Sequence, residues 1–276
     1  GKLFLIPEKN NFFLDISQAF CAFTIDKSKK SQSIKIVNDV TDSTSLLVEQ
    51  NGETTLDLLD LQSFSNLETI LPVDNVGWNI LKRIHKNPKI KNLENIVNLR
   101  GELDLTLDRE FISENGDGEF SLIRGNCIDS YLLKEEMIQT VKKEFYEKTT
   151  KRKYIDLERL ACQQISNLKS KKRIKFALVQ SGYVLANSCN FVLMKDSKKK
   201  LFDNFCLLGL LNSNLMEWRL RLSSSNNHIN NYELDDLPIP FSEENDWFYK
   251  KISRLTKKYV FTKNQMLISK IEALVF

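Results

Sequence analysis

The chain has 276 residues, of which 42% are hydrophobic and 28% are charged, enough for one or two domains with a buried core. Its formal net charge is only +4, but residues 141–200 hold 16 basic and 5 acidic side chains, a local balance of 16 − 5 = +11. The other 216 residues therefore carry 24 − 31 = −7. Charge that is segregated in this way favours a polyanionic partner, which an evenly mixed surface would not attract.

Other classes of protein are disfavoured by what the sequence lacks. Its apolar runs are far shorter than the roughly 20 residues of a spanning helix, and no signal-peptide pattern opens the chain, so we expect no membrane association. The cysteines are odd in number, widely spaced and mostly flanked by apolar residues: Cys21, Cys127, Cys162, Cys189 and Cys206. They are typical of reduced core thiols in a cytoplasmic protein. With two histidines and no C-x-x-C pattern, we expect no metal site.

The N-terminal part predicts strands followed by irregular helices. Residues 2–6 and 19–25 are continuously apolar, which is typical of interior strands buried on both faces. Such strands normally belong to a larger sheet, and we expect them to be the edge of a preceding domain. From residue 41 the chain becomes polar, with helices expected over 57–67 and 75–85. We interpret residues 41–99 as a connector between domains.

The next segments predict a mixture of strands and one helix. Residues 99–106 alternate as a half-exposed strand does, and residues 120–123 form a short strand that runs into Arg124-Gly125-Asn126. Arginine and asparagine read guanine and adenine edges bidentately, so Arg124 and Asn126 are candidate base contacts, although a strand-ending turn is equally compatible. Residues 132–145 have apolar positions three and four apart, which predicts an amphipathic helix.

The basic region predicts an antiparallel meander with a charged tip. Residues 159–166, 173–179 and 183–194 read as its three strands. The loop between the first two and a later lysine run supply the candidate phosphate contacts: Lys169, Ser170, Lys171, Lys172, Arg173, Lys198, Lys199 and Lys200. Such contacts release counterions and make affinity steeply salt-dependent. A solvated polar loop without a ligand is the alternative.

The C-terminal part predicts helices around a polar loop. Residues 205–211 and 215–222 read as two helices, with Asn212 and Ser213 suited to capping the second. The loop that follows contains Asn226, Asn227 and His228, whose side chains could face DNA bases or belong to a flexible surface loop. Residues 248–276 have apolar positions near helical spacing, which suggests an alternative function as a protein-interaction fragment that docks through this helix.

Several patches in chain order resemble one known family. They are Arg124–Asn126, Cys162–Arg173, Asn187–Phe191, Leu208–Ser213 and Leu234–Pro240. Together they resemble the TaqI-like C-terminal specificity domain, the target-recognition part of bacterial restriction-modification adenine methyltransferases of type IIS and type IIG systems. The resemblance implies sequence-specific recognition of double-stranded DNA and adds Asn190, in the third patch, to the candidate base contacts.

Residues 13–25 are similar to the last conserved strand region of the catalytic domain in such methyltransferases. The resemblance implies that Phe13 stacks on the flipped adenine, while a plain core position for Phe13 is the alternative. The family's glycine-rich cofactor motif and its Asn-Pro-Pro-aromatic motif do not occur in the sequence, and we expect them before residue 1. The chain is then not catalytic by itself. S-adenosylmethionine and an N-terminal catalytic part are expected only for the complete N6-adenine DNA methyltransferase, with or without an associated endonuclease.

We therefore predict an α+β fold, with an antiparallel sheet and packed helices and with N-terminal strands that resemble the edge of a methyltransferase sheet. The predicted organisation has four segments: the strand remnant 1–40, the connector 41–99, the DNA target-recognition domain 100–240 and the C-terminal helical segment 241–276.

Overall fold

The computed structural model describes residues 1–7, 10, 12–13, 19–28, 30–44, 53–62, 74–85, 87, 90–92, 96–194, 203–224, 226–240 and 246–275. The chain divides into two compact units, Gly1–Ile90 and Lys91–Phe276, each of which is described by itself. Both contain helices and sheets, so the α+β class is confirmed. The division into four segments stays a prediction. No helix among the described residues is both long and apolar enough to cross a bilayer.

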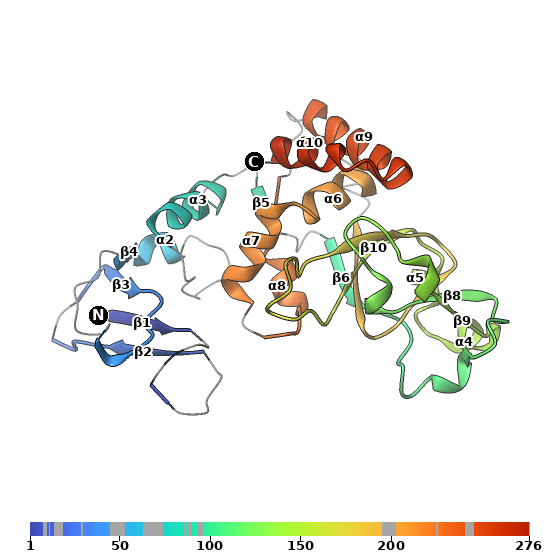
Figure 1. Ribbon diagram of the computed structural model, residues 1–276, viewed down its shortest axis with the longest axis horizontal. Coiled ribbons are helices and arrows are strands. Elements are labelled where there is room, and N and C mark those ends of the chain that lie inside the picture. The colour runs from blue at the N-terminus through green and yellow to red at the C-terminus, as the bar shows by residue number, and fades with distance from the viewer. Residues whose placement is uncertain are drawn as a thin grey trace. The chain divides into compact units, whose positions relative to one another are not determined.

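The first unit is built on a four-stranded sheet, shown in blue to cyan in Figure 1. Its strands are β1 (Lys2–Ile6), β2 (Phe20–Thr24), β3 (Ser33–Val37) and β4 (Glu53–Asp57), in the order β2-β1-β3-β4. The strand β1 is antiparallel to β2 and parallel to β3. Two helices follow, α2 (Leu58–Gln62) and α3 (Asn75–His85), of which α3 has the predicted bounds. Residues 53–57 thus continue this sheet, residues 58–62 form α2, and both belong to the unit that begins with β1.

The expected burial of the second N-terminal strand is wrong. The strand β2 is the edge strand of its sheet and pairs only with β1 among the described strands. Residues 21–24 are exposed, with Phe23 at 65% exposure, and Cys21 is an exposed thiol. Continuous apolarity predicted an interior strand, but an edge position leaves most of this strand open to solvent.

The second unit holds two four-stranded sheets and one two-stranded ribbon. The first sheet contains β6 (Ile96–Arg100), β10 (Arg159–Gln163), β11 (Phe176–Val179) and β13 (Cys189–Met194), in the order β11-β10-β13-β6. The second contains β7 (Ile112–Ser113), β8 (Phe120–Ile123), β9 (Gln139–Val141) and β12 (Tyr183–Leu185), in the order β12-β8-β9-β7. The ribbon pairs β5 (Ile90–Asn92) with β14 (Pro238–Pro240).

The helices of this unit lie mainly toward its C-terminal end. They are α4 (Lys143–Lys148), α5 (Arg152–Ile155), α6 (Asn204–Leu211), α7 (Asn214–Ser223), α8 (Asn231–Asp235), α9 (Asp246–Thr262) and α10 (Met266–Val275). The helices predicted over 205–211 and 215–222 are confirmed as α6 and α7. Ser213 is the N-cap of α7, since its hydroxyl accepts a hydrogen bond from the Met216 amide (3.3 Å).

The sheet that contains β10 is covered on both faces. Because side chains alternate along a strand, Leu160 and Cys162 belong to a core shared with α6, α9 and α10, while Ala161 packs in the core shared with the second sheet. Neighbouring strands alternate in the same way, with Phe176 on the helical side and Phe191 on the other. Both faces of this sheet therefore pack against a hydrophobic core, and the ends of the strands and their loops are left to contact a partner.

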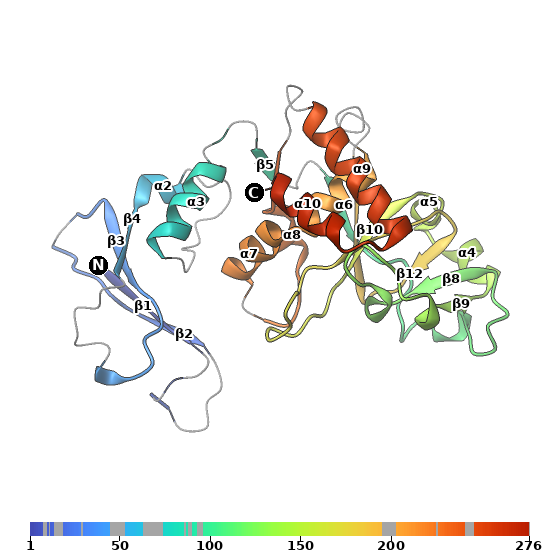
Figure 2. The same cartoon turned by 45° about the horizontal axis from the view of Figure 1, so that its top comes forward.

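The C-terminal helices use their apolar faces within the chain. The helix α9 lies against α6 and α10 (Figures 1 and 2). Ile252, Tyr259 and Ile271 are buried in the same core as the β10 sheet. Much of the face on which the partner-docking alternative depended therefore packs within the chain, while Met266 is 68% exposed.

Two sequence predictions for the second unit are wrong. The meander is broken because residues 183–194 form two strands, and β12 pairs in parallel with β8 in the other sheet. The helix expected over 132–145 is absent, since its central residues form β9, which lies between β8 and β7. The strand β9 contains the β-branched residues Thr140 and Val141 and pairs with a strand on each side. These interactions outweigh the helical spacing of the apolar residues in this segment.

Candidate nucleic-acid interface

The candidate site is organised by the backbone where β10 ends. The Gln164 amide donates to the Ser188 carbonyl (2.8 Å), and the Gln164 carbonyl accepts from the Ile229 amide (2.7 Å). Two residues later the Ser166 amide donates to the Asn227 carbonyl (2.8 Å). This one segment therefore fixes the loop before β13 and the loop before α8 at the same end of the sheet.

The Arg124-Gly125-Asn126 turn is attached to the same place. The Gly125 amide donates to the Ser188 hydroxyl (3.0 Å). A Cβ at Gly125 would lie 2.7 Å from the Ser188 carbonyl oxygen, so the close approach requires glycine. Asn126 is exposed, while Arg124 is half-buried and its Nε has no hydrogen-bond partner among the described residues. The turn does end strand β8, and it also presents both predicted side chains.

The Asn-rich loop is ordered by its own side chains. The Asn226 Oδ1 accepts from the His228 amide (2.7 Å), and the Asn227 Oδ1 accepts from the Leu168 amide (3.0 Å) in the basic loop. Asn226, Asn227 and His228 are all exposed. Their amide and imidazole groups therefore lie at the surface, on a backbone that hydrogen bonds hold in place.

The basic loop, residues 167–173, exposes fewer charged side chains to solvent than its sequence implied. Lys169 and Lys171 are exposed and Ser170 is half-buried, but Lys172 donates its ammonium to the Asn212 carbonyl. Burial lowers the pKa of Lys172. Arg173 is 0% exposed, so it cannot reach a phosphate in this conformation. Of the predicted tip cations, two remain at the surface.

Arg173 instead braces the Asn-rich loop from inside. Its guanidinium donates to the Ser224 carbonyl (3.3 Å) and to the Asn226 carbonyl (2.6 Å). Burial lowers the pKa of Arg173, against the opposing effect of Glu233. The assignment of Arg173 as a phosphate contact is corrected to a structural role, because its side chain is fully buried and both of its terminal nitrogens donate to backbone carbonyl groups.

Asn190 is also placed inside the protein. It is fully buried on β13, and its Nδ2 donates to the Ile229 carbonyl (2.9 Å). The assignment of Asn190 as a base contact is corrected, since its amide ties the sheet to the Asn-rich loop. Lys198, Lys199 and Lys200 lie outside the described residues.

Side chains of helix α7 hold the basic loop in place, a contact that the sequence did not reveal. Arg221 donates to the carbonyl groups of Leu168 (3.2 Å) and Ser170 (2.6 Å), and its side chain is paired with Glu217. The Glu217 carboxylate also accepts from the amides of Arg173 (2.9 Å) and Ile174 (2.8 Å). The basic loop is thus preorganised by a helix more than forty residues away in the chain.

Several exposed or polar residues at the end of β10 were also missed. Gln164, with its amide oriented to suit its neighbours, accepts from the guanidinium of Arg100 (2.9 and 3.2 Å) and donates to the Asn187 carbonyl (2.8 Å). Gln163 is half-buried and Ile165 is exposed. The change from an apolar strand to Gln163-Gln164 is the signal in the sequence that could have located this end.

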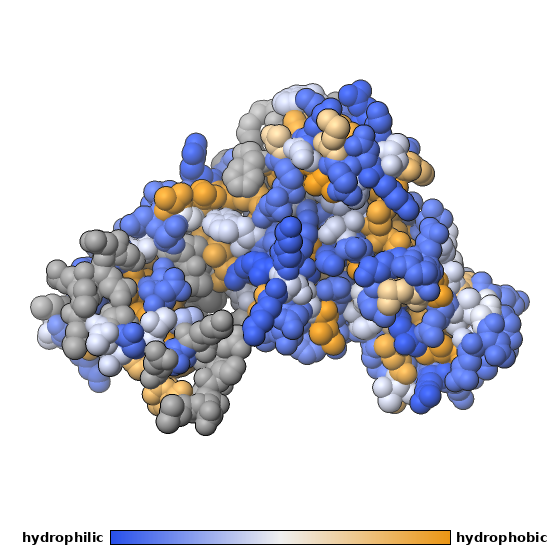
Figure 3. All heavy atoms as spheres, in the orientation of Figure 1, coloured by the Kyte–Doolittle hydropathy of each residue, from blue (hydrophilic) through white to orange (hydrophobic). Residues whose placement is uncertain are grey.

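We use the name polar ridge for the surface that these loops share. Its members are Arg124, Asn126, Ile165, Lys169, Lys171, Asn226, Asn227 and His228. The space-filling view shows a mostly hydrophilic surface over α7, α8 and the neighbouring loops (Figure 3). The structure therefore brings together the base-contact and phosphate-contact candidates, apart from those that are buried or lie outside the described residues.

The comparisons with known proteins identify the segment that carries this ridge. Residues 121–239 match the family model of the TaqI-like C-terminal specificity domain. This segment of the chain is therefore similar to a TaqI-like C-terminal specificity domain. The match begins in β8 and ends in β14, so the specificity domain includes every residue of the polar ridge.

Two solved structures are similar to the whole chain. One is described as the type IIL restriction-modification enzyme MmeI in complex with DNA (10% identity, TM-score 0.46), and the other as the type IIG restriction endonuclease BpuSI (11% identity, TM-score 0.44). Each match covers 100% of this chain, which spans 40% and 43% of those two proteins, respectively. No curated protein matches the sequence.

The positive charge of the specificity domain is partly internal. Arg159, which opens the basic region, is fully buried and donates to both carboxylate oxygens of Glu102 (3.1 and 3.2 Å). Burial raises the pKa of Glu102 and lowers the pKa of Arg159, so each charge depends on the other. The local excess counted from the sequence therefore overstates the charge that a polyanion would meet.

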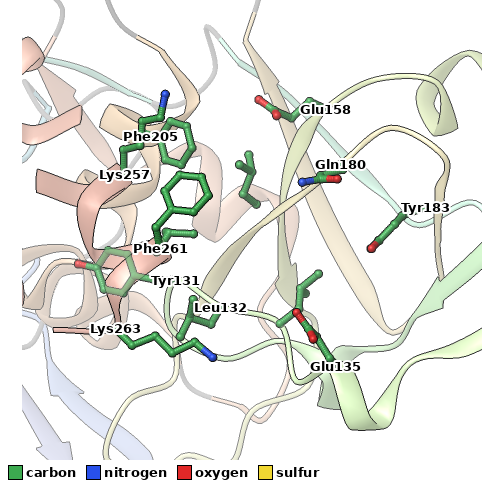
Figure 4. A pocket seen from close by; sticks show the side chains of 13 residues that line it. Tyr131, Leu132, Glu135, Glu158, Gln180, Tyr183, Phe205, Lys257, Phe261 and Lys263 are labelled. Atoms are coloured by element: carbon green, nitrogen blue, oxygen red, sulfur yellow. The ribbon is translucent and has the colours of Figure 1, made fainter. Parts of the chain in front are cut away.

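A pocket of about 450 Å³ lies between α9, β11 and the loop at Tyr131 (Figure 4). Its labelled lining includes the aromatic rings of Tyr131, Phe205 and Phe261 and the charged ends of Lys257 and Glu158. Its lining holds no cysteine, serine or histidine. The described residues contain no cluster of metal-ligating side chains either, so we assign no reaction to this pocket.

Proposed function

We propose that the chain recognises double-stranded DNA in a sequence-specific manner through the polar ridge. The observation that carries the proposal is the hydrogen-bonded junction at the end of β10. It holds the Arg124–Asn126 turn, the basic loop and the Asn-rich loop on one surface of a TaqI-like specificity domain. A preorganised surface is favourable for binding because little side-chain and loop entropy is lost.

The members of the ridge divide by chemistry into two roles. Lys169 and Lys171 would neutralise phosphates, and Lys198–Lys200, which lie outside the described residues, are a further candidate. Such contacts position the duplex without reading its sequence. Arg124, Asn126, Asn226, Asn227 and His228 would contact base edges. A good bidentate contact discriminates by about 1–3 kcal/mol against the wrong base.

We further propose that the complete protein is a restriction-modification N6-adenine DNA methyltransferase of the type IIS or type IIG class, located in the cytoplasm with its DNA substrate. In that protein Phe13 would stack on the flipped adenine. Its ring is 54% exposed and lies 5.4 Å from the ring of Phe20, centroid to centroid, which supports an accessible aromatic face.

The described residues do not fit S-adenosylmethionine. The two glycines that lie closest together in the sequence are Gly116 and Gly118. They connect β7 to β8, both of which pair antiparallel with β9, and β8 rather than a helix follows these glycines. A glycine-rich loop that holds the nucleoside part of such a cofactor needs a strand, a tight turn and a helix start. We therefore assign recognition to this chain and methyl transfer to an N-terminal catalytic part.

Competitive gel-shift titrations of the chain with random duplex DNA test the proposal. The double variant Lys169→Glu with Lys171→Glu should weaken binding to all duplexes alike, and the slope of log affinity against log salt should fall by about 2. Lys258→Glu, an equal change of charge at an exposed position on α9, is the control. Duplex binding that is absent, or is unchanged in the double variant, would refute the assignment.

A further inference from the structure

Ile165 is an exposed aliphatic residue within an otherwise polar surface. Its side chain is 57% exposed, whereas its neighbours Gln164 and Ser166 are buried, as expected where a strand alternates between its two faces. The other members of the polar ridge carry amide, imidazole, ammonium or guanidinium groups. Single exposed aliphatic residues are common, so exposure alone says little.

The backbone on both sides of Ile165 is held by hydrogen bonds. Gln164 bonds Ser188 and Ile229, Ser166 bonds Asn227, and Ile165 itself forms a bridge with His228. A β-branched side chain has few rotamers on such a backbone. Ile165 is therefore presented in one direction, next to two of the candidate base contacts.

We propose that Ile165 is a specificity-determining residue that contacts the C5-methyl group of a thymine in the major groove. This inference rests on the proposed DNA recognition. Aliphatic contact with that methyl group is one of the few ways in which an apolar side chain reads a base. The amide groups beside it read hydrogen-bonding edges in the same groove. A short side chain on a fixed backbone suits a base edge better than insertion between base pairs.

The test uses a duplex selected from a random library by the unmodified chain, followed by replacement of each thymine with uracil in turn. Uracil lacks only the C5-methyl group. At one position the replacement should weaken binding about fourfold, the effect of one buried methyl-sized group. Ile165→Ala should lose a similar factor on the thymine duplex and should be insensitive to uracil at that position, while Ile165→Val should keep the sensitivity.

Three results would overturn the inference: a selected sequence without thymine, uracil replacement without effect at every position, or equal uracil sensitivity in Ile165→Ala and the unmodified chain. A uniform loss of affinity for all duplexes in Ile165→Ala would also overturn it and would indicate a wedge between bases. The melting temperature of Ile165→Ala should be unchanged, because the side chain is more than half exposed. If the unmodified chain selects no duplex at all, the proposed function itself has failed.

Discussion

At the scale of single residues, buried arginines stabilise the second unit from inside. Arg159, Arg173 and Arg219 are fully buried, and the first two were counted in the positive excess of residues 141–200. Arginine is suited to such positions because its planar fork can satisfy several carbonyl or carboxylate groups at once. The sequence shows where basic residues are concentrated, but it could not separate the cations that stabilise the loops from inside from the cations that face outward.

Arg173 offers a direct test of this distinction. Arg173→Lys keeps the charge but cannot donate to both Ser224 and Asn226, so we expect a loss of about 2–4 kcal/mol in the free energy of unfolding. Urea denaturation measures the change. A lysine variant with unaltered stability would contradict the bracing role. Lys169→Arg, at an exposed position in the same loop, should leave stability unchanged.

The cysteines give a prediction that depends on pH. Burial raises the pKa of Cys162 to about 12, and burial also raises the pKa values of Cys189 and Cys206. A raised pKa keeps these thiols protonated at pH 8, and only the thiolate reacts quickly. One thiol per chain, Cys21, should therefore react rapidly with a disulfide reagent at pH 8, and the other four only after denaturation. Rapid reaction of two or more thiols in the folded chain would contradict the burial.

At the scale of elements, local sequence patterns predicted the helices and strands whose formation depends mainly on their own residues. The helices α3, α6 and α7 and the strand β8 were predicted because each carries its own signal, such as the cap at Ser213. Strand β9 was not predicted, and neither was the pairing of β12 with β8, since both depend on partners elsewhere in the chain. The candidate site behaved likewise: exposed loop residues were identifiable, whereas the braces from α7 required the fold.

The packing of α6 on α9 gives a prediction at this scale. A Cβ at Gly209 would lie 2.5 Å from the Thr256 hydroxyl oxygen and 2.7 Å from a methyl carbon of Ile252. Gly209→Ala should therefore lower the free energy of unfolding by about 1–3 kcal/mol through overpacking, despite alanine's better helix propensity. Thermal unfolding of the variant and of the unmodified chain measures this change in stability. A more stable Gly209→Ala variant would show that the two helices are less closely packed.

At the scale of the whole molecule, the central claim is that duplex DNA binds over the polar ridge. The measurement that tests it most directly is amine acetylation of the chain with and without saturating duplex DNA, read out by mass spectrometry for each lysine. The account predicts that labelling of Lys169 and Lys171 falls on addition of duplex, while labelling of Lys258 stays constant. Undiminished labelling of Lys169 and Lys171 in the bound state would contradict it.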